Sequence, residues 1–287
     1  MKPLSSLLSE SPLIQAMAAH SPLSARLAQE AGFDAIWASG FELSALYGLP
    51  DVSLTTMTEH LSMTRAMAAQ VTCPVIADID TGFGNAVNVD HAVREYERAG
   101  ASAVVIEDKL FPKVTSLVEG GRQELLRTEE FQGKIEAACN ARDNGCFKII
   151  ARTEALIAGQ GVKEALRRGY AYAQAGADLL LVHSKSKTPD EIEAFIEGWT
   201  DPCPLVLVPT SYPEMTTERM SRSGKVAIAI WGNHAIRASV KAMQDCFARI
   251  RREGGILNVD AEIAPVNEVF RLQKMERVRM LEKSYLR

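Results

Sequence analysis

The 287-residue sequence lacks the features that mark several classes of protein. Its five cysteines include no Cys-x-x-Cys pair and are too sparse for a disulfide framework, which favours reduced, intracellular thiols. The net charge of -4 provides no basic surface of the kind that nucleic acid requires. No apolar run approaches the length of a membrane span, and the first residues carry no apolar signal-peptide core. We therefore expect a cytoplasmic protein that binds neither nucleic acid nor membranes.

Two further absences concern the fold. No Gly/Ser-rich linker or low-complexity stretch divides the chain, so we predict a single domain over residues 1–287. No Gly-x-Gly-x-x-Gly motif follows the first candidate strand, which disfavours a dinucleotide-binding open sheet. Hydrophobic residues make up 47% of the chain, enough for the sizeable core that one large domain needs.

Three passages repeat one pattern of a helix end, a glycine and a buried strand: Gln29–Trp37, Tyr96–Val105 and Tyr172–Leu181. This pattern is typical of the second half of a strand-helix-strand unit. Further apolar runs between them give eight candidate strands, which begin near residues 13, 34, 74, 103, 147, 178, 204 and 226. Eight strands that alternate with helices predict an α/β fold of the (β/α)8 TIM-barrel type, with a doubly wound open sheet as the alternative.

The tail from about residue 235 to 287 exceeds what a barrel needs. Ala235–Glu253 and, roughly, Val266–Leu281 have helical patterns with apolar residues at intervals. Surplus amphipathic helices usually pack on a neighbouring subunit or cap the barrel floor. We therefore treat the tail as a helical extension of the one domain.

Polar and charged residues end nearly every predicted strand. In a parallel barrel, the carboxyl ends of the strands converge on one mouth. The uncharged run Ala103–Ile106 is followed at once by Glu107, Asp108 and Lys109. Ionised groups at the end of a buried strand are costly unless another group pairs with them or coordinates them. A site for an anionic, metal-bound substrate would use such groups.

Three carboxylates are candidate metal ligands. Asp78 and Asp80 are two residues apart on a predicted strand, so we expect their side chains to share one face. With Glu107 from the next strand they form an oxygen-rich cluster suited to Mg²⁺. The alternative is an Asp-x-Asp pair that caps the strand in solvent. The buried run before the pair and the Thr81–Gly84 turn after it favour the metal.

Single residues at other strand ends leave their roles open. Arg152 is suited to a carboxylate or phosphate-like group, or to an internal salt bridge with Glu107 or Glu154. His183 is suited to an oxyanion or a proton transfer, or is a satisfied core histidine. His60 has the position of a helix-surface residue.

A polar loop follows the strand that begins at Ala103. Pro112 ends regular strand pairing, and Lys113, Thr115 and Ser116 come after it. Pro112 and Gly120-Gly121 bracket the segment, so we expect residues 113–128 to act as a gate over the mouth.

Motifs in a fixed order cover nearly the whole chain: LSARLAQEAGFDAIWASGF, ADIDTGFGN, EDKLFPKVTSL, ARTEALIAG, LLLVHSK, VPTSY and IWGNHAIRAS. Together they resemble the isocitrate lyase/phosphoenolpyruvate mutase superfamily. The resemblance implies a (β/α)8 barrel, a Mg²⁺ cofactor with Mn²⁺ or Co²⁺ as other divalent cations, and an α-keto acid or its enolate as the reacting group. It also implies a homotetramer, a dimer of dimers, in which C-terminal helices swap between subunits.

The loop sequence indicates a branch of this superfamily. Carbon–carbon lyases carry a cysteine in a KKCGH-like loop, and Phe111–Leu117 has none. The EDKxFPK pattern resembles the branch that acts on 3-phosphonopyruvate. Where the mutases of that branch have asparagine, this chain has Thr115, as the hydrolases do. The resemblance thus implies Mg²⁺-dependent hydrolysis of the P–C bond to pyruvate and phosphate. Phosphoenolpyruvate mutase activity, a carbon–carbon lyase and a non-catalytic barrel are the alternatives.

The same resemblance implies roles for the metal and pyruvyl side of the site. Asp78 would bind Mg²⁺ directly, and Asp80 and Glu107 would bind it through water. Trp37 and the amides of Ser39-Gly40-Phe41 would hold the pyruvyl part of the substrate.

On the phosphonyl side, the resemblance implies that Arg152 and His183 contact phosphonyl oxygens or the developing enolate. Lys113, Thr115 and Ser116 would close over the phosphonyl group and orient water.

One more loop residue, Asp51, lies where the mutases keep a catalytic aspartate. Covalent attack on phosphorus and simple positioning of the phosphonyl group both remain open for it.

Overall fold

The computed structural model describes residues 3–116, 118 and 120–287, and its eight parallel strands close into a barrel in the order β1 to β8. The strands are β1 (Ile14–Ala19), β2 (Ala35–Ala38), β3 (Val75–Asp78), β4 (Ala103–Glu107), β5 (Lys148–Thr153), β6 (Leu179–Val182), β7 (Leu205–Leu207) and β8 (Val226–Trp231). This confirms the predicted (β/α)8 barrel. Each strand begins within one residue of its predicted start.

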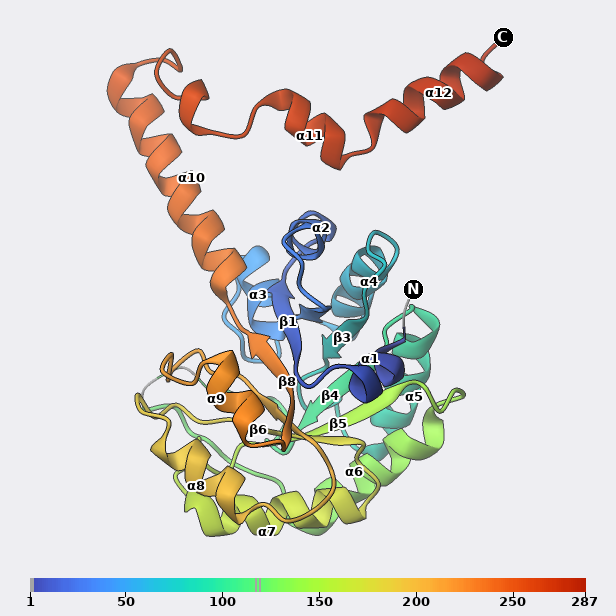
Figure 1. Ribbon diagram of the computed structural model, residues 1–287, viewed down its shortest axis with the longest axis vertical. Coiled ribbons are helices and arrows are strands. Elements are labelled where there is room, and N and C mark those ends of the chain that lie inside the picture. The colour runs from blue at the N-terminus through green and yellow to red at the C-terminus, as the bar shows by residue number, and fades with distance from the viewer. Residues whose placement is uncertain (1–2, 117, 119) are drawn as a thin grey trace. The chain divides into compact units, whose positions relative to one another are not determined.

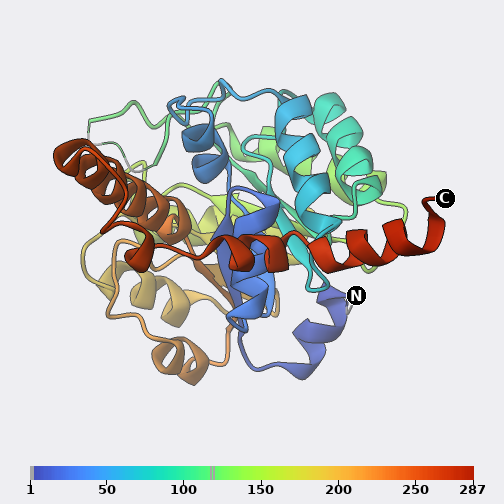
Figure 2. The same cartoon turned by 90° about the horizontal axis from the view of Figure 1, so that it is seen from above.

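Helices surround the strands, and all of them except α1, which precedes β1, follow a strand (Figure 1). They are α1 (Leu4–Glu10), α2 (Pro22–Glu30), α3 (Gly40–Leu46), α4 (Met57–Ala68), α5 (Ala86–Arg98), α6 (Thr128–Ala141), α7 (Gly161–Gln174), α8 (Asp190–Gly198) and α9 (Thr217–Arg222). Helices α4 and α5 run side by side, as a second view also shows (Figure 2). Leu4 of α1 belongs to the apolar cluster inside the barrel.

The three repeated glycines end helices as the sequence predicts. Gly32, Gly100 and Gly176 have φ angles of 91°, 89° and 102°, in the left-handed region that favours glycine. Each glycine reverses the chain after α2, α5 or α7 and sends it into the next strand.

The strands separate two apolar layers because successive side chains point to opposite faces. In β4, Ala103 and Val105 join the cluster inside the barrel. Val104 and Ile106 join the outer cluster, between the strands and the helices. A strand buried on both faces therefore needs the unbroken apolar run that the sequence shows.

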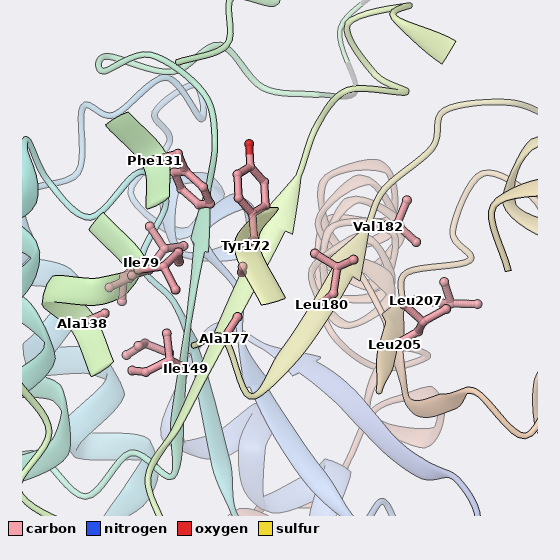
Figure 3. Close-up of a cluster of buried hydrophobic side chains, with 14 of the residues drawn as sticks. Ile79, Phe131, Ala138, Ile149, Tyr172, Ala177, Leu180, Val182, Leu205 and Leu207 are labelled. Carbon is pink, nitrogen blue, oxygen red and sulfur yellow. The ribbon is translucent and has the colours of Figure 1, made fainter. Parts of the chain in front are cut away.

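Aromatic rings fill part of the outer layer. Phe131 of α6 and Tyr172 of α7 pack edge to face with ring centroids 4.5 Å apart. Figure 3 shows both rings beside the strands, with Ile149 and Leu180 in the same layer. Burying each large apolar side chain contributes about 1.5–3 kcal/mol, so this layer holds the helices on the barrel.

The same alternation continues to the end of each strand. In β4 the next inner position is Glu107, and the next outer position is Asp108. The last inner position of β5 is Arg152, and the next inner position after the end of β6 is His183. Polar side chains at inner positions therefore meet above the apolar interior.

The chain divides into two compact units, Met1–Ala235 and Ile236–Arg287. The helices of the tail are α10 (His234–Glu253), a short 3-10 helix η1 (Asp260–Glu262), α11 (Val266–Leu272) and α12 (Met275–Tyr285). The prediction of one continuous helix over roughly Val266–Leu281 is therefore wrong, because this stretch forms two helices. Lys274 has a left-handed φ of 56° and separates α11 from α12.

Three expectations about the whole chain stay predictions: one domain over residues 1–287, an extension that belongs to it, and a swap between subunits. Among the described residues, no helix is long and apolar enough to cross a membrane.

Packing between α7 and β6 leads to a stability prediction. A Cβ at Gly169 would lie 2.7 Å from Leu180 Cδ2 and 2.9 Å from a ring carbon of Trp199. We expect Gly169→Ala to lower the free energy of unfolding by about 1–3 kcal/mol, because overpacking forces buried groups apart. The control is Gly133→Ala in α6, where a Cβ would meet nothing within 4 Å. Gly133→Ala should raise the free energy of unfolding by about 0.5–1 kcal/mol. Urea unfolding measures both, and equal effects would contradict the prediction.

Candidate active site

A cavity opens where the strands end. The side chains from the predicted site that line it are Trp37, Ser39, Phe41, Asp51, Asp78, Lys113, Thr115, Ser116, Arg152 and His183. The remaining predicted residues, Gly40, Asp80 and Glu107, touch members of this set. The fold therefore brings the predicted residues together, whereas their individual roles stay predictions.

Asp78 and Asp80 lie close together for a reason that differs from the predicted one. Strand β3 ends at Asp78, and Asp80 sits in a turn with a left-handed φ of 51°. The expectation that both share one face of a strand is therefore wrong. The turn brings the two carboxylates together instead, and a Cβ at Gly40 would lie 2.8 Å from Asp80 Oδ1 and 3.4 Å from Asp78 Oδ2. Only glycine leaves the carboxylates this room.

Lys113 joins two carboxylates from different parts of the chain. Its Nζ lies 2.6 Å from Asp80 Oδ1 and 2.9 Å from Asp51 Oδ1. Burial opposes the charge of Lys113, but Asp80 and Asp51 outweigh it and hold the pKa of the ammonium well above its usual range. Burial, with Asp51 and Asp78 adding to it, raises the pKa of Asp80 to about 7 despite Lys113. One lysine does not balance so many buried carboxylates.

Glu107 shows the same shortage of positive charge. It is almost fully buried, and neither of its carboxylate oxygens has a hydrogen-bond partner among the described residues. The Nε of Arg152 lies 3.3 Å from its Oε2. Burial raises the pKa of Asp78 as well, with Glu107 and Asp51 adding to the effect. A divalent cation between these carboxylates would relieve both conditions.

The donors fit Mg²⁺ better than a cation that takes only protein ligands. No three His, Cys, Asp or Glu side chains in the described part of the chain form a ready metal-binding group. Mg²⁺ usually keeps several waters and binds through one or two carboxylates. A single direct ligand, with other carboxylates reached through water, is compatible with this geometry.

Arg152 and His183 form one wall of the cavity and share Glu154 as a partner; we call it the cationic wall because Arg152 carries a positive charge. Arg152 Nη2 lies 2.9 Å from His183 Nδ1, and its Nε donates to Glu154 Oε1 at 2.6 Å. Burial opposes the charge of Arg152, but Glu154 and Glu107 hold its pKa above the usual range. Burial and Arg152 together lower the pKa of His183, so the imidazole is neutral at pH 7. Arg152 thus both makes the internal salt bridges and lines the cavity.

The loop covers this wall with Ser116. Its Oγ donates to Glu154 Oε2 at 2.5 Å and accepts from Lys109 Nζ at 2.7 Å. Thr115 lines the cavity beside it, and the Thr115 carbonyl accepts from Gln123 Nε2 at 3.0 Å. Residues 117 and 119 of the predicted gate lie outside the described residues.

Asp108 supports the wall from the outer layer. It accepts from the Tyr172 hydroxyl at 2.7 Å, from Arg168 Nη1 at 3.2 Å and from the backbone N–H of Glu154 at 2.8 Å. Burial raises the pKa of Asp108 to about 6 in spite of these bonds. Its role is to hold the backbone at Glu154, which the pattern of strand ends alone does not indicate.

The assignment of His60 to a helix surface is wrong. His60 of α4 is 3% exposed, and its Nδ1 lies 2.9 Å from the Tyr96 hydroxyl of α5. Burial and Lys113 lower its pKa to about 4. The helical pattern missed it because α5 packs against α4 and buries His60 beside Tyr96.

Further lining residues come from the ends of β7 and β8, and none of them had a predicted role. Val208 and Thr210 follow β7, and Gly232 and Asn233 follow β8. The Thr210 hydroxyl donates to the Gly232 carbonyl at 3.4 Å. The position of these residues after strands β7 and β8 was the signal for them.

Comparison with known proteins identifies the lineage of this site. The family model described as phosphoenolpyruvate phosphomutase matches residues 4–251. The chain belongs to this family. It is 59% identical over 275 residues to the phosphonopyruvate hydrolase of Variovorax sp. (strain Pal2), a match that covers 96% of this chain and 95% of that protein.

Two solved structures share the fold over almost their full length. A crystal structure of phosphonopyruvate hydrolase in complex with oxalate and Mg²⁺ has a TM-score of 0.94 and 56% identity, and the match covers 99% of this chain and 98% of that one. A phosphoenolpyruvate phosphomutase from Streptomyces platensis subsp. rosaceus has a TM-score of 0.96 and 46% identity, with the same coverage. Family membership confirms the resemblance seen in the motifs.

His60 leads to a prediction about acid stability. Its folded pKa of about 4 lies below the usual 6.5, so the unfolded chain binds a proton that the folded one rejects between these values. Stability should therefore fall as pH drops from 7 to 5, by about 2 kcal/mol from this residue. His60→Gln lacks the titrating imidazole and therefore does not lose this stability. The difference in the free energy of unfolding between the parent and His60→Gln should thus become smaller as the pH drops from 7 to 5.

The control for this experiment is His91→Gln, since His91 is exposed on α5. The difference in the free energy of unfolding between the parent and His91→Gln should not change with pH. Chemical denaturation at pH 7, 6 and 5 measures all three proteins. A gap between parent and His60→Gln that stays constant with pH would contradict a neutral, buried His60.

Proposed function

We propose that this protein hydrolyses the P–C bond of 3-phosphonopyruvate to pyruvate and phosphate with Mg²⁺ as cofactor. The observation that carries the proposal is the loop threonine, Thr115, placed over a mouth that joins excess carboxylates to an arginine–histidine wall. The similarity to phosphonopyruvate hydrolase over nearly the whole chain supports it.

Charge supports a metal-dependent reaction. Carboxylates outnumber cations around the cavity, so a substrate with a carboxylate and a phosphonate would be repelled from the metal-free mouth. Asp78 would hold Mg²⁺ directly, with Asp80 and Glu107 holding its waters. The metal supplies a Lewis acid for the carboxylate and keto oxygens of the pyruvyl group. The oxalate in the related crystal presents two adjacent oxygens of the same kind.

The pyruvyl group would lie against Trp37 and the start of α3. Ser39 is the N-cap of α3, and its Oγ accepts from the backbone N–H of Glu42 at 3.3 Å. This leaves the N–H groups of Gly40 and Phe41 at the open first turn of the helix, where they would bind a carboxylate.

The phosphonyl group would lie between the loop and the cationic wall. Lys113 and Arg152 would balance its charge, and neutral His183 would donate or accept a hydrogen bond at one of its oxygens. In the reaction, phosphorus bonds to a water oxygen, the P–C electron pair leaves with carbon as pyruvate enolate, and a proton then restores pyruvate. Asp51, held by Lys113, would take the phosphorus covalently or position the group for water.

The cavity does not favour a carbon–carbon lyase. The lyases use a loop cysteine as general acid, and the five cysteines of this chain, Cys73, Cys139, Cys146, Cys203 and Cys246, do not line the cavity. The phosphomutase reaction remains the competing activity, because phosphomutases share the family and the fold.

We also propose a cytoplasmic homotetramer, a dimer of dimers, with tail helices that swap between subunits. The tail exposes several large apolar side chains that a monomer would leave in water: Phe247, Leu257, Val266, Met280 and Leu286. Burial against a second copy would remove them from solvent.

A phosphorus NMR time course with 3-phosphonopyruvate and Mg²⁺ tests the function and its metal. The parent should form inorganic phosphate and pyruvate in equal amounts, and a phosphoenolpyruvate signal would instead indicate the mutase. Asp78→Ala should lower the rate by roughly 10³-fold, since a Lewis-acid metal contributes several kcal/mol. The control is Asp90→Ala, a surface carboxylate on α5 paired with Arg94. Full activity in Asp78→Ala that a chelator still abolishes would place the metal elsewhere.

Thr115→Asn tests the branch. In a mutase the phosphoryl group must be recaptured by oxygen, so water has to be excluded, and asparagine would fill the space that a water needs. We expect hydrolysis to fall by about 10²–10⁴-fold, with a trace of phosphoenolpyruvate, because a placed catalytic contact is lost. Thr115→Ser, which keeps the hydroxyl in a smaller side chain, should retain most activity. Equal rates for the parent and Thr115→Asn would remove Thr115 as the determinant.

A further inference from the structure

Glu154 holds two parts of the site with its two oxygens. It is fully buried. Its Oε1 accepts from Arg152 Nε at 2.6 Å and lies 3.0 Å from His183 Nδ1. Its Oε2 accepts from Ser116 Oγ at 2.5 Å and lies 3.1 Å from Lys109 Nζ. One carboxylate therefore contacts the cationic wall and the loop at the same time.

Lys109 is a buried cation that the reaction described above does not use. It follows β4 directly and is 1% exposed. Its Nζ donates to the Val114 carbonyl at 2.8 Å and to Ser116 Oγ at 2.7 Å, in addition to its ion pair with Glu154. Two of its three partners belong to the loop. If the loop left, this buried ammonium would lose most of its hydrogen bonds, which is costly.

The hydroxyl of Ser116 has a fixed orientation as a result. Its single proton goes to Glu154, and its oxygen faces Lys109 Nζ and, at 3.3 Å, Arg152 Nη2. A hydroxyl has one proton to donate, so Ser116 cannot also donate to a substrate while it is docked. In this state its contribution is to hold the loop on the wall.

Other contacts define how the loop sits. The Lys113 amide donates to Ser53 Oγ at 3.1 Å, so its hydrogen exchange reports on docking of residues 113–116. At the base of the loop, the Leu110 amide donates to the Glu124 carbonyl at 3.0 Å. The base is thus fastened separately from the tip, which Lys109 and Glu154 hold.

We propose that Lys109 and Glu154 are positioning residues that couple docking of loop residues 113–116 to the orientation of Arg152 and His183. This inference rests on the proposed function, because it explains how the phosphonyl group meets an ordered wall only when the loop excludes bulk water. The coupling is reciprocal. A docked loop orders the wall through Glu154, and an ordered wall holds Glu154 in place for Ser116.

An ordinary buried salt bridge would also connect Lys109 to Glu154, so the test has to separate coupling from mere stability. The discriminating change is His183→Gln. It touches no loop contact among the described residues, yet it releases one partner of Glu154 Oε1. Coupling predicts that the Lys113 amide exchanges about threefold faster or more in this variant, whereas a local salt bridge predicts no change.

Lys109→Met removes the ammonium and keeps a similar length. We expect the Lys113 amide to exchange about 10-fold faster, while the amides of β4 keep their protection. The kcat/KM for 3-phosphonopyruvate should fall about 10²-fold, because small misplacements of catalytic groups have effects of that size. The matched control is Lys148→Met, which removes a strand lysine paired with Asp178 at the other end of β5. It should change neither quantity by more than about twofold.

The outcomes separate this proposal from the proposed function. Without hydrolysis by the parent, the proposed function is wrong, and the exchange of the Lys113 amide in Lys109→Met and His183→Gln still decides whether the coupling exists. Faster exchange in both variants supports it. Parent-like exchange in His183→Gln, or kcat/KM in Lys109→Met within twofold of the parent, overturns it. Thermal unfolding of each variant shows whether the fold is retained at the assay temperature.

Discussion

The alternation of side chains along parallel strands determines what reaches the barrel mouth. Inner positions are apolar through the depth of the barrel and become charged or polar at the ends of the strands, as with Val105 and Glu107 in β4. The neighbouring outer position, Asp108, faces the helices and binds Tyr172 instead. Adjacent carboxylates thus have different roles only because they point to opposite faces. A register shift of one residue would exchange these roles and bury the wrong charges.

Burial makes the charged groups at the barrel mouth depend on partners of opposite charge. Taking an ion out of water is costly, so each charge at the mouth needs a partner. Arg152 and Glu154 satisfy each other, as do Lys113 and Asp51. Neither carboxylate oxygen of Glu107 has a hydrogen-bond partner among the described residues. Burial also raises the pKa of Asp80 to about 7. The protein alone is therefore short of positive charge at this site, and a divalent cation would supply it.

The sequence predicts the barrel well because local signals and the global fold agree. Apolar runs and glycine caps place every strand, and strand ends place most cavity residues. Features that depend on a single backbone angle or on another helix were not predictable. The turn at Asp80 and the break at Lys274 rest on left-handed φ angles that no pattern demands of these residues. The burial of His60 depends on how α4 lies against α5, which is a tertiary effect.

The reaction is less constrained by the fold than the site is. A hydrolase and a phosphomutase match this chain with nearly equal TM-scores, so the barrel does not distinguish transfer to water from transfer to oxygen of the same substrate. Strand-end residues such as Arg152 are fixed by packing and by buried partners on both sides. Thr115 has no such restriction, because its side chain is only partly buried on a loop. A change of reaction within the family therefore meets least resistance in the loop.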